Sequence, residues 1–141
     1  MLKELEEEII EYLESENIGT PVKVFTEVNL ADEGVFIKWE GIPYVNIIME
    51  NGPSFITHHV IARINSKSLR HPVGLYDLIE LVMSKLTNFD MDNCSPMQLM
   101  SVSPPPEKPD SKGFYSSTIR FSLKSRFDVK VHKKSVLPAA P

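Results

Sequence analysis

The histidines and the single cysteine are the side chains in this chain of 141 residues that are best suited to bind a metal ion or perform covalent chemistry. His58 and His59 are adjacent, so in a strand they point to opposite faces and cannot hold one ion together. His71, His132 and Cys94 are isolated, and no spacing among them resembles a zinc or iron site. We therefore expect neither a metal ion nor a cofactor.

The loop "NFDMDNCS" is the next candidate, because it carries Asp90, Asp92 and Asn93. It lacks the glycine and the bidentate glutamate that a calcium loop requires. The chain also contains no glycine-rich phosphate loop and no nucleophile elbow. The sequence therefore predicts no catalytic residue, no small-molecule substrate and a protein that is not an enzyme.

Basic residues recur along one face of "YSSTIRFSLKSRFDVKV", residues 115–131. Alternate positions are apolar, as in a half-buried strand, although strands usually span only about 5 or 6 residues. The opposite positions carry the cations Arg120, Lys124, Arg126 and Lys130. Such a row can contact phosphates, but the aromatic residues of this strand alternate onto the other face, so no base-stacking platform accompanies it. Contact with another protein and simple solubility are the favoured interpretations.

The charge of the chain is divided between its two ends. The formal net charge is −4, yet residues 1–16 hold seven glutamates and one lysine, whereas residues 112–134 are strongly basic. The glutamates that we expect to form a surface complementary to the basic strand are Glu4, Glu7, Glu8 and Glu11. Opposite charges attract within one chain or between neighbouring copies. Two separately solvated faces are the alternative.

Hydrophobic spacing predicts an α+β fold. Apolar residues recur at intervals of three and four in residues 2–14 and 74–86, which indicates two amphipathic helices. Alternating apolar positions predict strands at residues 22–28, 35–41, 55–66, 97–103 and 115–131. Asn51-Gly52 is a hairpin signal, but Pro53 delays the strand that follows. We expect a small, mostly antiparallel sheet flanked by two main helices, with a long C-terminal strand.

Length and composition fit one domain, residues 1–131, followed by an extended tail, residues 132–141. No apolar run approaches the length of a membrane span, and the acidic start does not resemble a secretory signal. One cysteine permits no internal disulfide, which suits a reducing cytoplasm. The proline-rich "PPPEKPDSKG", residues 104–113, predicts a mobile connection between two neighbouring strands.

The second half of the chain carries a specific order of elements. In "SLRHPVGLYDLIELVMSKLTNF" a polar turn and Gly-x-Tyr open a helix, and "QLMSVSPPPEKPDSKGFYSSTIRFSLKSR" adds a short strand, a loop and a long last strand. This order resembles the tail-completion, or tail-terminator, proteins of Mu-like long-tailed bacteriophages. The matching positions are Gly74, Tyr76, Leu78, Leu86 and Phe89 around the helix and Phe114, Tyr115, Ile119 and Phe121 in the last strand. The resemblance covers about residues 1–128 as an architecture, and its specific pattern lies within about 68–125.

The resemblance implies a structural virion protein at the tail–neck junction, assembled in the host cytoplasm. In that family six copies close into a ring that caps the tail tube, ends its polymerisation and joins the tail to the neck or head. The implied partners are identical copies, the tail tube protein, the neck or connector protein and, in a contractile tail, the sheath protein, with no membrane partner. A head-completion or neck connector subunit and a small nucleic-acid-binding accessory protein are the alternatives.

Within such a ring, the basic strand and the acidic helix would contact a subunit or the tube, and the 104–113 loop would face neck, tube or sheath. A strand over residues 115–131 would span roughly 55 Å if fully extended. We expect its first half to pack in the sheet. We expect its later part, with residues 132–141, to reach the acidic helix of a neighbouring copy.

Overall fold

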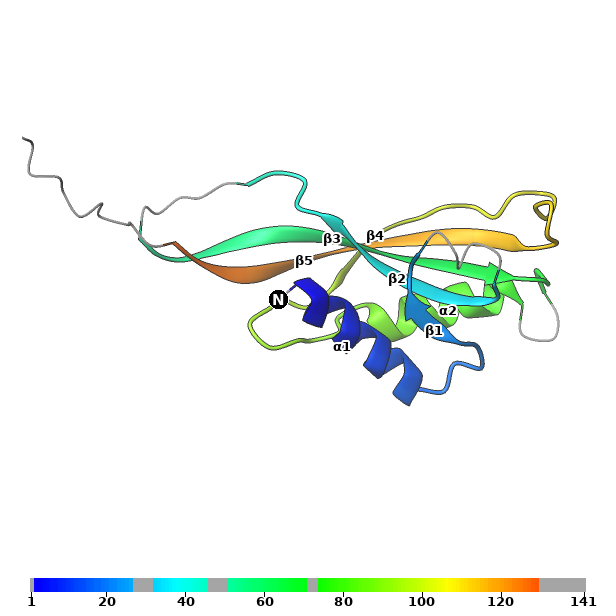
Figure 1. The fold of residues 1–141 in the computed structure, drawn as a ribbon, viewed down its shortest axis with the longest axis horizontal. Coiled ribbons are helices and arrows are strands. Elements are labelled where there is room, and N and C mark those ends of the chain that lie inside the picture. The colour runs from blue at the N-terminus through cyan, green and yellow to red at the C-terminus, as the bar shows by residue number, and fades with distance from the viewer. Residues whose placement is uncertain (1, 27–31, 46–50, 71–73, 130–141) are drawn as a thin grey trace, which may run out of the picture.

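The computed structural model describes residues 2–26, 32–45, 51–70 and 74–129. Their fold confirms the predicted α+β class. The elements are α1 (Leu2–Ser15), β1 (Val22–Val24), β2 (Gly34–Gly41), β3 (Gly52–Ser66), α2 (Leu75–Leu86), β4 (Gln98–Val102) and β5 (Tyr115–Val129). The strands form one sheet in the order β1-β2-β3-β5-β4, in which β1 is parallel to β2 and the other neighbours are antiparallel (Figure 1).

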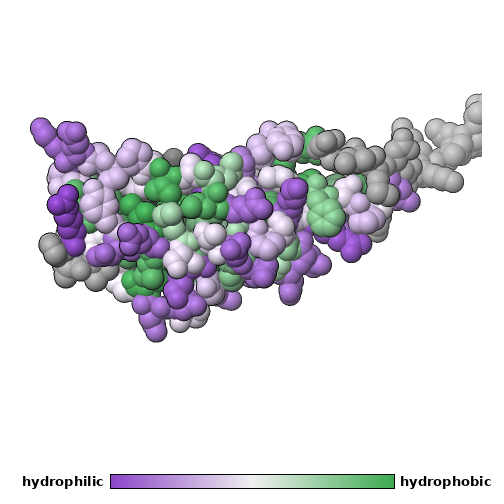
Figure 2. Space-filling model, turned by 180° about the vertical axis from the view of Figure 1, so that it is seen from behind, coloured by the Kyte–Doolittle hydropathy of each residue, from purple (hydrophilic) through white to green (hydrophobic). Residues whose placement is uncertain are grey.

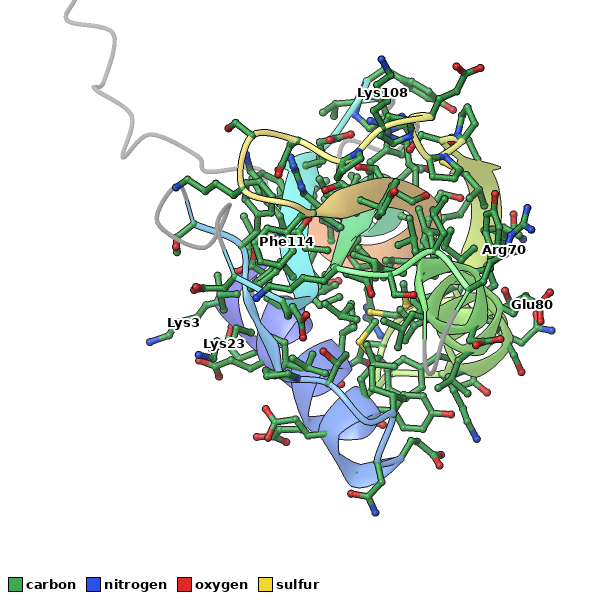
Figure 3. The ribbon with its side chains drawn as sticks, turned by 90° about the vertical axis from the view of Figure 1, so that its right-hand side faces the viewer. Lys3, Lys23, Arg70, Glu80, Lys108 and Phe114 are labelled. Carbon is green, nitrogen blue, oxygen red and sulfur yellow. The ribbon has the colours of Figure 1, made fainter. Side chains whose placement is uncertain are left out.

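Both helices pack on the same face of the sheet (Figure 1). Seen end-on in Figure 3, α1 and α2 lie beneath the sheet, whereas the loop that carries Lys108 lies over the opposite face. The buried residues of the inward face are Val35, Ile37, Val60, Ala62, Ile64, Ile119, Phe121 and Leu123. They pack against Leu5, Ile9 and Leu13 of α1 and Leu75, Leu78, Val82 and Leu86 of α2. Burying each such leucine or isoleucine contributes roughly 1.5–3 kcal/mol, so the predicted apolar stripes attach the helices to the sheet.

The start of β3 corrects the sequence prediction. We expected a start near residue 55 because Pro53 cannot donate a ladder hydrogen bond, but β3 begins at Gly52, and Pro53 pairs with Asp128 of β5. Pairing with β2 extends only to His59, so one side of β3 near Pro53 faces no strand among the described residues. A missing N–H costs little on such a side. Gly52 is therefore a strand residue rather than part of a hairpin turn.

The first strand is shorter than the predicted 22–28. β1 ends at Val24, and the Phe25 amide adds one hydrogen bond, to the Ile37 carbonyl, at 2.9 Å. Residues 27–31 lie outside the described part of the chain.

Gly74 begins α2 where two backbone segments almost touch. A Cβ at this position would lie 2.4 Å from both the carbonyl carbon and the carbonyl oxygen of Leu69. The first helical amides, Leu75 and Tyr76, donate hydrogen bonds to the carbonyls of Ser68 and Leu69 at 2.8 and 3.1 Å. Because these bonds satisfy the amino end of the helix, the connector cannot move away without breaking them.

We expect Gly74→Ala to lower the free energy of unfolding by about 1–3 kcal/mol, because the added methyl group overpacks this contact. Urea denaturation measures the loss. The control is Ser84→Ala at an exposed position of α2, which should change stability by no more than about 0.5 kcal/mol. Equal midpoints for the two variants would show that the connector yields at no cost.

β3 and β5 extend together beyond the rest of the sheet. They pair without interruption until Gly52 meets Val129, whereas β2 pairs with β3 only as far as His59 and β4 pairs with β5 only as far as Ser122. Beyond these points the two strands form a twisted ribbon whose outer end projects past both helices (Figure 1). We call this ribbon the arm, residues 52–58 and 123–129.

The arm corrects our hypothesis for the later half of the long strand. We expected that half to leave the sheet and reach a neighbour alone, but β5 stays paired with β3 of its own chain to Val129. The early start of β3 supplies the partner. Residues 130–131 of the predicted strand and the tail 132–141 lie outside the described residues.

Candidate functional site

The basic face of β5 is partly neutralised within the chain. Arg120, Lys124 and Arg126 alternate with buried residues, as predicted. However, Arg120 Nη2 lies 2.6 Å from Glu40 Oε1, and Arg126 Nε lies 3.1 Å from Asp128 Oδ1. Exposed ion pairs add little stability, but they reduce the net positive charge that this face presents. The face is therefore a weaker phosphate-binding surface than the sequence indicates.

The predicted acidic surface is exposed but divided. Its residues, Glu4, Glu7, Glu8 and Glu11, are all exposed. Glu7 lies 3.9 Å from Lys3 on α1. Glu4 and Glu8 line a groove at the base of the arm, whereas Glu7 and Glu11 do not. Lys130, the fourth predicted cation, lies outside the described residues.

This groove, which we call the arm-base groove, has a volume of about 500 Å³. α1 contributes Glu4, Leu5 and Glu8, the loop after α2 contributes residues 91–94, and the arm contributes Arg126 and Asp128. Arg120 and Lys124 do not line it. Glu4, Glu8 and Arg126 thus line one groove of a single chain, whereas the hypothesis of a ring placed the acidic helix of one copy against the basic strand of another.

Backbone hydrogen bonds hold the loop wall of the groove against β5. The Ser95 amide donates to the Lys124 carbonyl at 2.7 Å, and the Arg126 amide donates to the Asn93 carbonyl at 3.1 Å. Cys94 lies between these bonds, and its backbone forms an isolated antiparallel β-bridge with Ser125. The segment that the sequence identified only as a loop after a helix therefore covers the edge of β5 at the base of the arm.

Cys94 lies in the groove beside two carboxylates. Burial, followed by the charges of Glu8 and Asp92, raises the pKa of the Cys94 thiol. A hydrogen bond from the amino terminus lowers the pKa of Glu4 on the same groove. The groove therefore favours the protonated thiol of Cys94, whereas the environment of a reactive cysteine favours the thiolate.

We expect Cys94 to react with iodoacetamide more slowly than free cysteine at pH 8, because only the thiolate attacks. Glu8→Gln should speed the reaction, since it removes a charge that raises the pKa of the thiol. Glu11→Gln, on the same helix but outside the groove, is the matched control. Mass spectrometry of the labelled protein measures the rates. Equal rates for Glu8→Gln and Glu11→Gln would contradict this description of the groove.

A chain of hydrogen-bonded polar side chains joins β2, β3 and β5 at the base of the arm. Trp39 Nε1 donates a hydrogen bond to His58 Nδ1 at 3.0 Å, and His58 Nε2 lies 2.6 Å from Ser125 Oγ. Because Nδ1 accepts, the neutral ring carries its proton on Nε2 and donates to Ser125. His58 and Ser125 are fully buried. This arrangement cannot activate Ser125 as a nucleophile, because a catalytic histidine must accept the serine proton.

The sequence predicted only part of this chain. His58 lies on the apolar face with Val60, as the alternation predicted, and it is buried. Its partners were missed, although Trp39 and Ser125 also stand at positions with apolar-face periodicity. The usable signal is that polar groups at buried strand positions need hydrogen-bond partners.

One carboxylate of functional interest had no sequence signal. The Glu6 side chain accepts a hydrogen bond from the Trp39 backbone amide at 2.8 Å. This contact covers the edge of β2 beyond the end of β1, where a strand edge would otherwise be open. It also fixes α1, and with it one wall of the groove, relative to the sheet.

The arm exposes two aromatic side chains. Phe55 of β3 is 62% exposed and Phe127 of β5 is 43% exposed. They stand at strand positions of opposite parity, since Phe55 pairs with Arg126 and Phe127 pairs with Ser54, so both faces of the arm are apolar at one point. Large exposed aromatic groups beside open strand edges are typical of surfaces that bind protein.

A second apolar surface lies on the body, away from the arm. Leu99 and Met100 of the edge strand β4 are 37% and 48% exposed, and Tyr76 of α2 is 41% exposed. Figure 2 shows apolar side chains gathered on this side of the molecule, where α2 and β4 lie. The outer edge of β4 pairs with no other strand among the described residues.

Searches of the described residues for a metal site and a membrane-spanning helix found neither, and comparisons with family models and curated proteins found no match. Within the described ranges, no cluster of three or more histidine, cysteine or acidic side chains is placed to hold a metal ion. None of the described helices has the length and apolar character needed to span a membrane. Neither the protein-family models nor the curated proteins include a match to this chain.

Proposed function

We propose that this protein is a tail terminator, a structural subunit whose copies close into a six-membered ring on the end of a phage tail tube. Two features support the proposal. The pattern within residues 68–125 resembles that family, and the described residues form a small, mostly antiparallel sheet with two helices, in keeping with what the resemblance implies.

The observation that carries the proposal is the arm. A two-stranded ribbon that projects from the body exposes 62% of Phe55 and 43% of Phe127 to solvent, at a cost to an isolated chain. Contact with a second copy would bury both rings and occupy the open strand edges. The arm is therefore built for association rather than for chemistry.

A ring requires two different surfaces on each copy, because head-to-tail contacts repeat around a closed rotation. The arm supplies one surface. The edge of β4, with exposed Leu99 and Met100, supplies the second, since an open strand edge pairs readily with another backbone. The two surfaces lie on separate parts of the molecule, as a closed ring of identical subunits needs.

A nucleic-acid-binding function receives less support. Two of the three described cations on the basic face, Arg120 and Arg126, already pair with carboxylates. The aromatic residues of the same strand do not stand beside these cations, so bases would find no stacking platform.

The experiment that tests the proposal is a tube-growth assay. The protein is added to tail tube protein of the same particle during polymerisation, and tube lengths are measured by electron microscopy. We expect shorter tubes that do not resume growth when fresh tube protein is supplied. Unchanged lengths together with binding to isolated necks would instead identify a neck connector subunit.

A further inference from the structure

The arm-base groove has a chemical character that the association of arms does not use. Its lining includes the buried apolar side chains of Leu5 and Met91 and the acidic side chains of Glu4, Glu8 and Asp92 from the body. Asp128 and Arg126 close it on the arm side, where they also pair with each other at 3.1 Å. Four acidic side chains and one arginine line the groove, so its formal net charge is negative.

We propose that this groove binds the C-terminal tail, residues 130–141, of a second copy of the chain. The inference rests on the proposed function insofar as both require copies to associate. It adds that the arm-base groove is the binding site and that the tail of one copy occupies the groove of another.

Charge and composition of the tail match the groove. The segment "KVHKKSVLPAAP" holds Lys130, Lys133 and Lys134 and no acidic side chain. Its apolar residues, Val136 and Leu137, follow directly after the lysines. A segment that carries both cations and aliphatic groups is complementary to a groove lined by acidic side chains and buried apolar ones.

The position of the tail favours a neighbouring copy over its own body. β5 runs outward along the arm and ends at Val129, beyond both helices (Figure 1). To enter its own groove, the tail would have to reverse direction at once. Of the residues that dominate tight turns, residues 130–137 contain only Ser135, six positions after Val129, and no glycine, proline, asparagine or aspartate. Extended at about 3.3 Å per residue, these eight residues reach roughly 26 Å past the arm.

The single cysteine makes the proposal directly testable, because Cys94 lines the groove. The wild-type chain is mixed with Cys94→Ser chains that carry Val136→Cys, and the mixture is oxidised mildly with diamide. On a non-reducing gel we expect a mixed covalent dimer, in which Cys94 of the wild-type chain is joined to the cysteine introduced at position 136 of the other chain. The collision control replaces the wild type by Cys94→Ser chains that carry Ser84→Cys on α2, and its yield should be at least about tenfold lower.

Two outcomes would overturn the proposal. A separate variant, Val136→Cys alone, keeps Cys94 and can therefore form a disulfide within one chain. An internal link without a mixed dimer would place the tail in the groove of its own chain. Absence of any link to Cys94, with Val131→Cys tested in the same way, would show that the tail does not enter the groove.

Charge reversal separates specific docking from proximity. Lys133→Glu with Lys134→Glu in the tail should lower the yield of the mixed disulfide at least about tenfold. Glu4→Lys with Glu8→Lys in the groove-bearing partner should restore it. Failure of this rescue would contradict charge recognition by the groove.

The same samples distinguish this inference from the proposed function. Tubes capped by the wild-type chain, together with no disulfide between the cysteine introduced at position 136 and Cys94 of a second copy, would overturn the tail inference and leave the tail terminator intact. A mixed disulfide, together with a protein that has no effect on tube growth, would support the tail inference and contradict the tail terminator.

Discussion

Phe55→Ser combined with Phe127→Ser should abolish self-association while the fold is retained. Both rings are substantially exposed, so their loss should change the stability of an isolated chain by no more than about 0.5 kcal/mol each. At an interface, aromatic anchors of this kind contribute about 2 kcal/mol each, which corresponds to more than tenfold in the dissociation constant per residue. Sedimentation velocity over a concentration series measures the difference.

The matched control keeps the same positions apolar. Phe55→Leu combined with Phe127→Leu should retain most of the association, because burial of apolar area rather than ring chemistry is expected to drive it. Far-ultraviolet circular dichroism and urea midpoints show whether each variant folds. A serine variant that folds and associates as the wild type does would remove the arm from the interface.

His58→Leu should be the most destabilising single change outside the apolar core. The substitution keeps the volume of the side chain but leaves Trp39 Nε1 and the buried Ser125 hydroxyl without their shared partner. We expect a loss of about 2–4 kcal/mol in the free energy of unfolding, because each orphaned buried polar group costs about 1–3 kcal/mol. His59→Leu is the control, since the adjacent side chain points to the opposite face and is half-buried. Similar losses for the two variants would contradict the role given to His58.

The same histidine predicts how stability depends on pH. Burial lowers the pKa of His58 below its ordinary value of 6.5, so the unfolded chain binds this proton more readily than the folded chain. Stability contributed by the neutral ring is therefore complete above about pH 6.5 and is lost as the pH falls toward the folded-state pKa. Thermal unfolding from pH 8 to pH 5 should show this decline, and His58→Leu should show a smaller one. A parallel decline in both proteins would assign the effect to other groups.

The sequence predicted the helices and the inward faces of the strands because these depend on local periodicity. Intervals of three and four in α1 and α2, and alternation in β5 from Ser117 to Ser125, follow from which side of each element meets the core. The alternation ends at Phe127 because no helix lies beneath the arm there, and an apolar residue at that position is exposed.

The arm was not predictable from local rules. Pro53 argues against a strand start unless one side of the strand is known to lack a neighbour, and that knowledge depends on where β2 ends. The same limit applies to the candidate site. The sequence suggested Glu4, Glu8 and Arg126 as complementary charges, but only the packing of α1 at the base of the arm places all three along one groove of a single chain.

Negative-stain imaging of the purified protein mixed with tail tubes shows whether the protein closes into a ring on the tube ends. We predict collars of six copies at the tube ends, absent from samples that contain the Phe55→Ser, Phe127→Ser protein. Bare tube ends, together with a solution mass of 16.0 kDa at every concentration, would show a protein that acts as a single copy and would contradict the account.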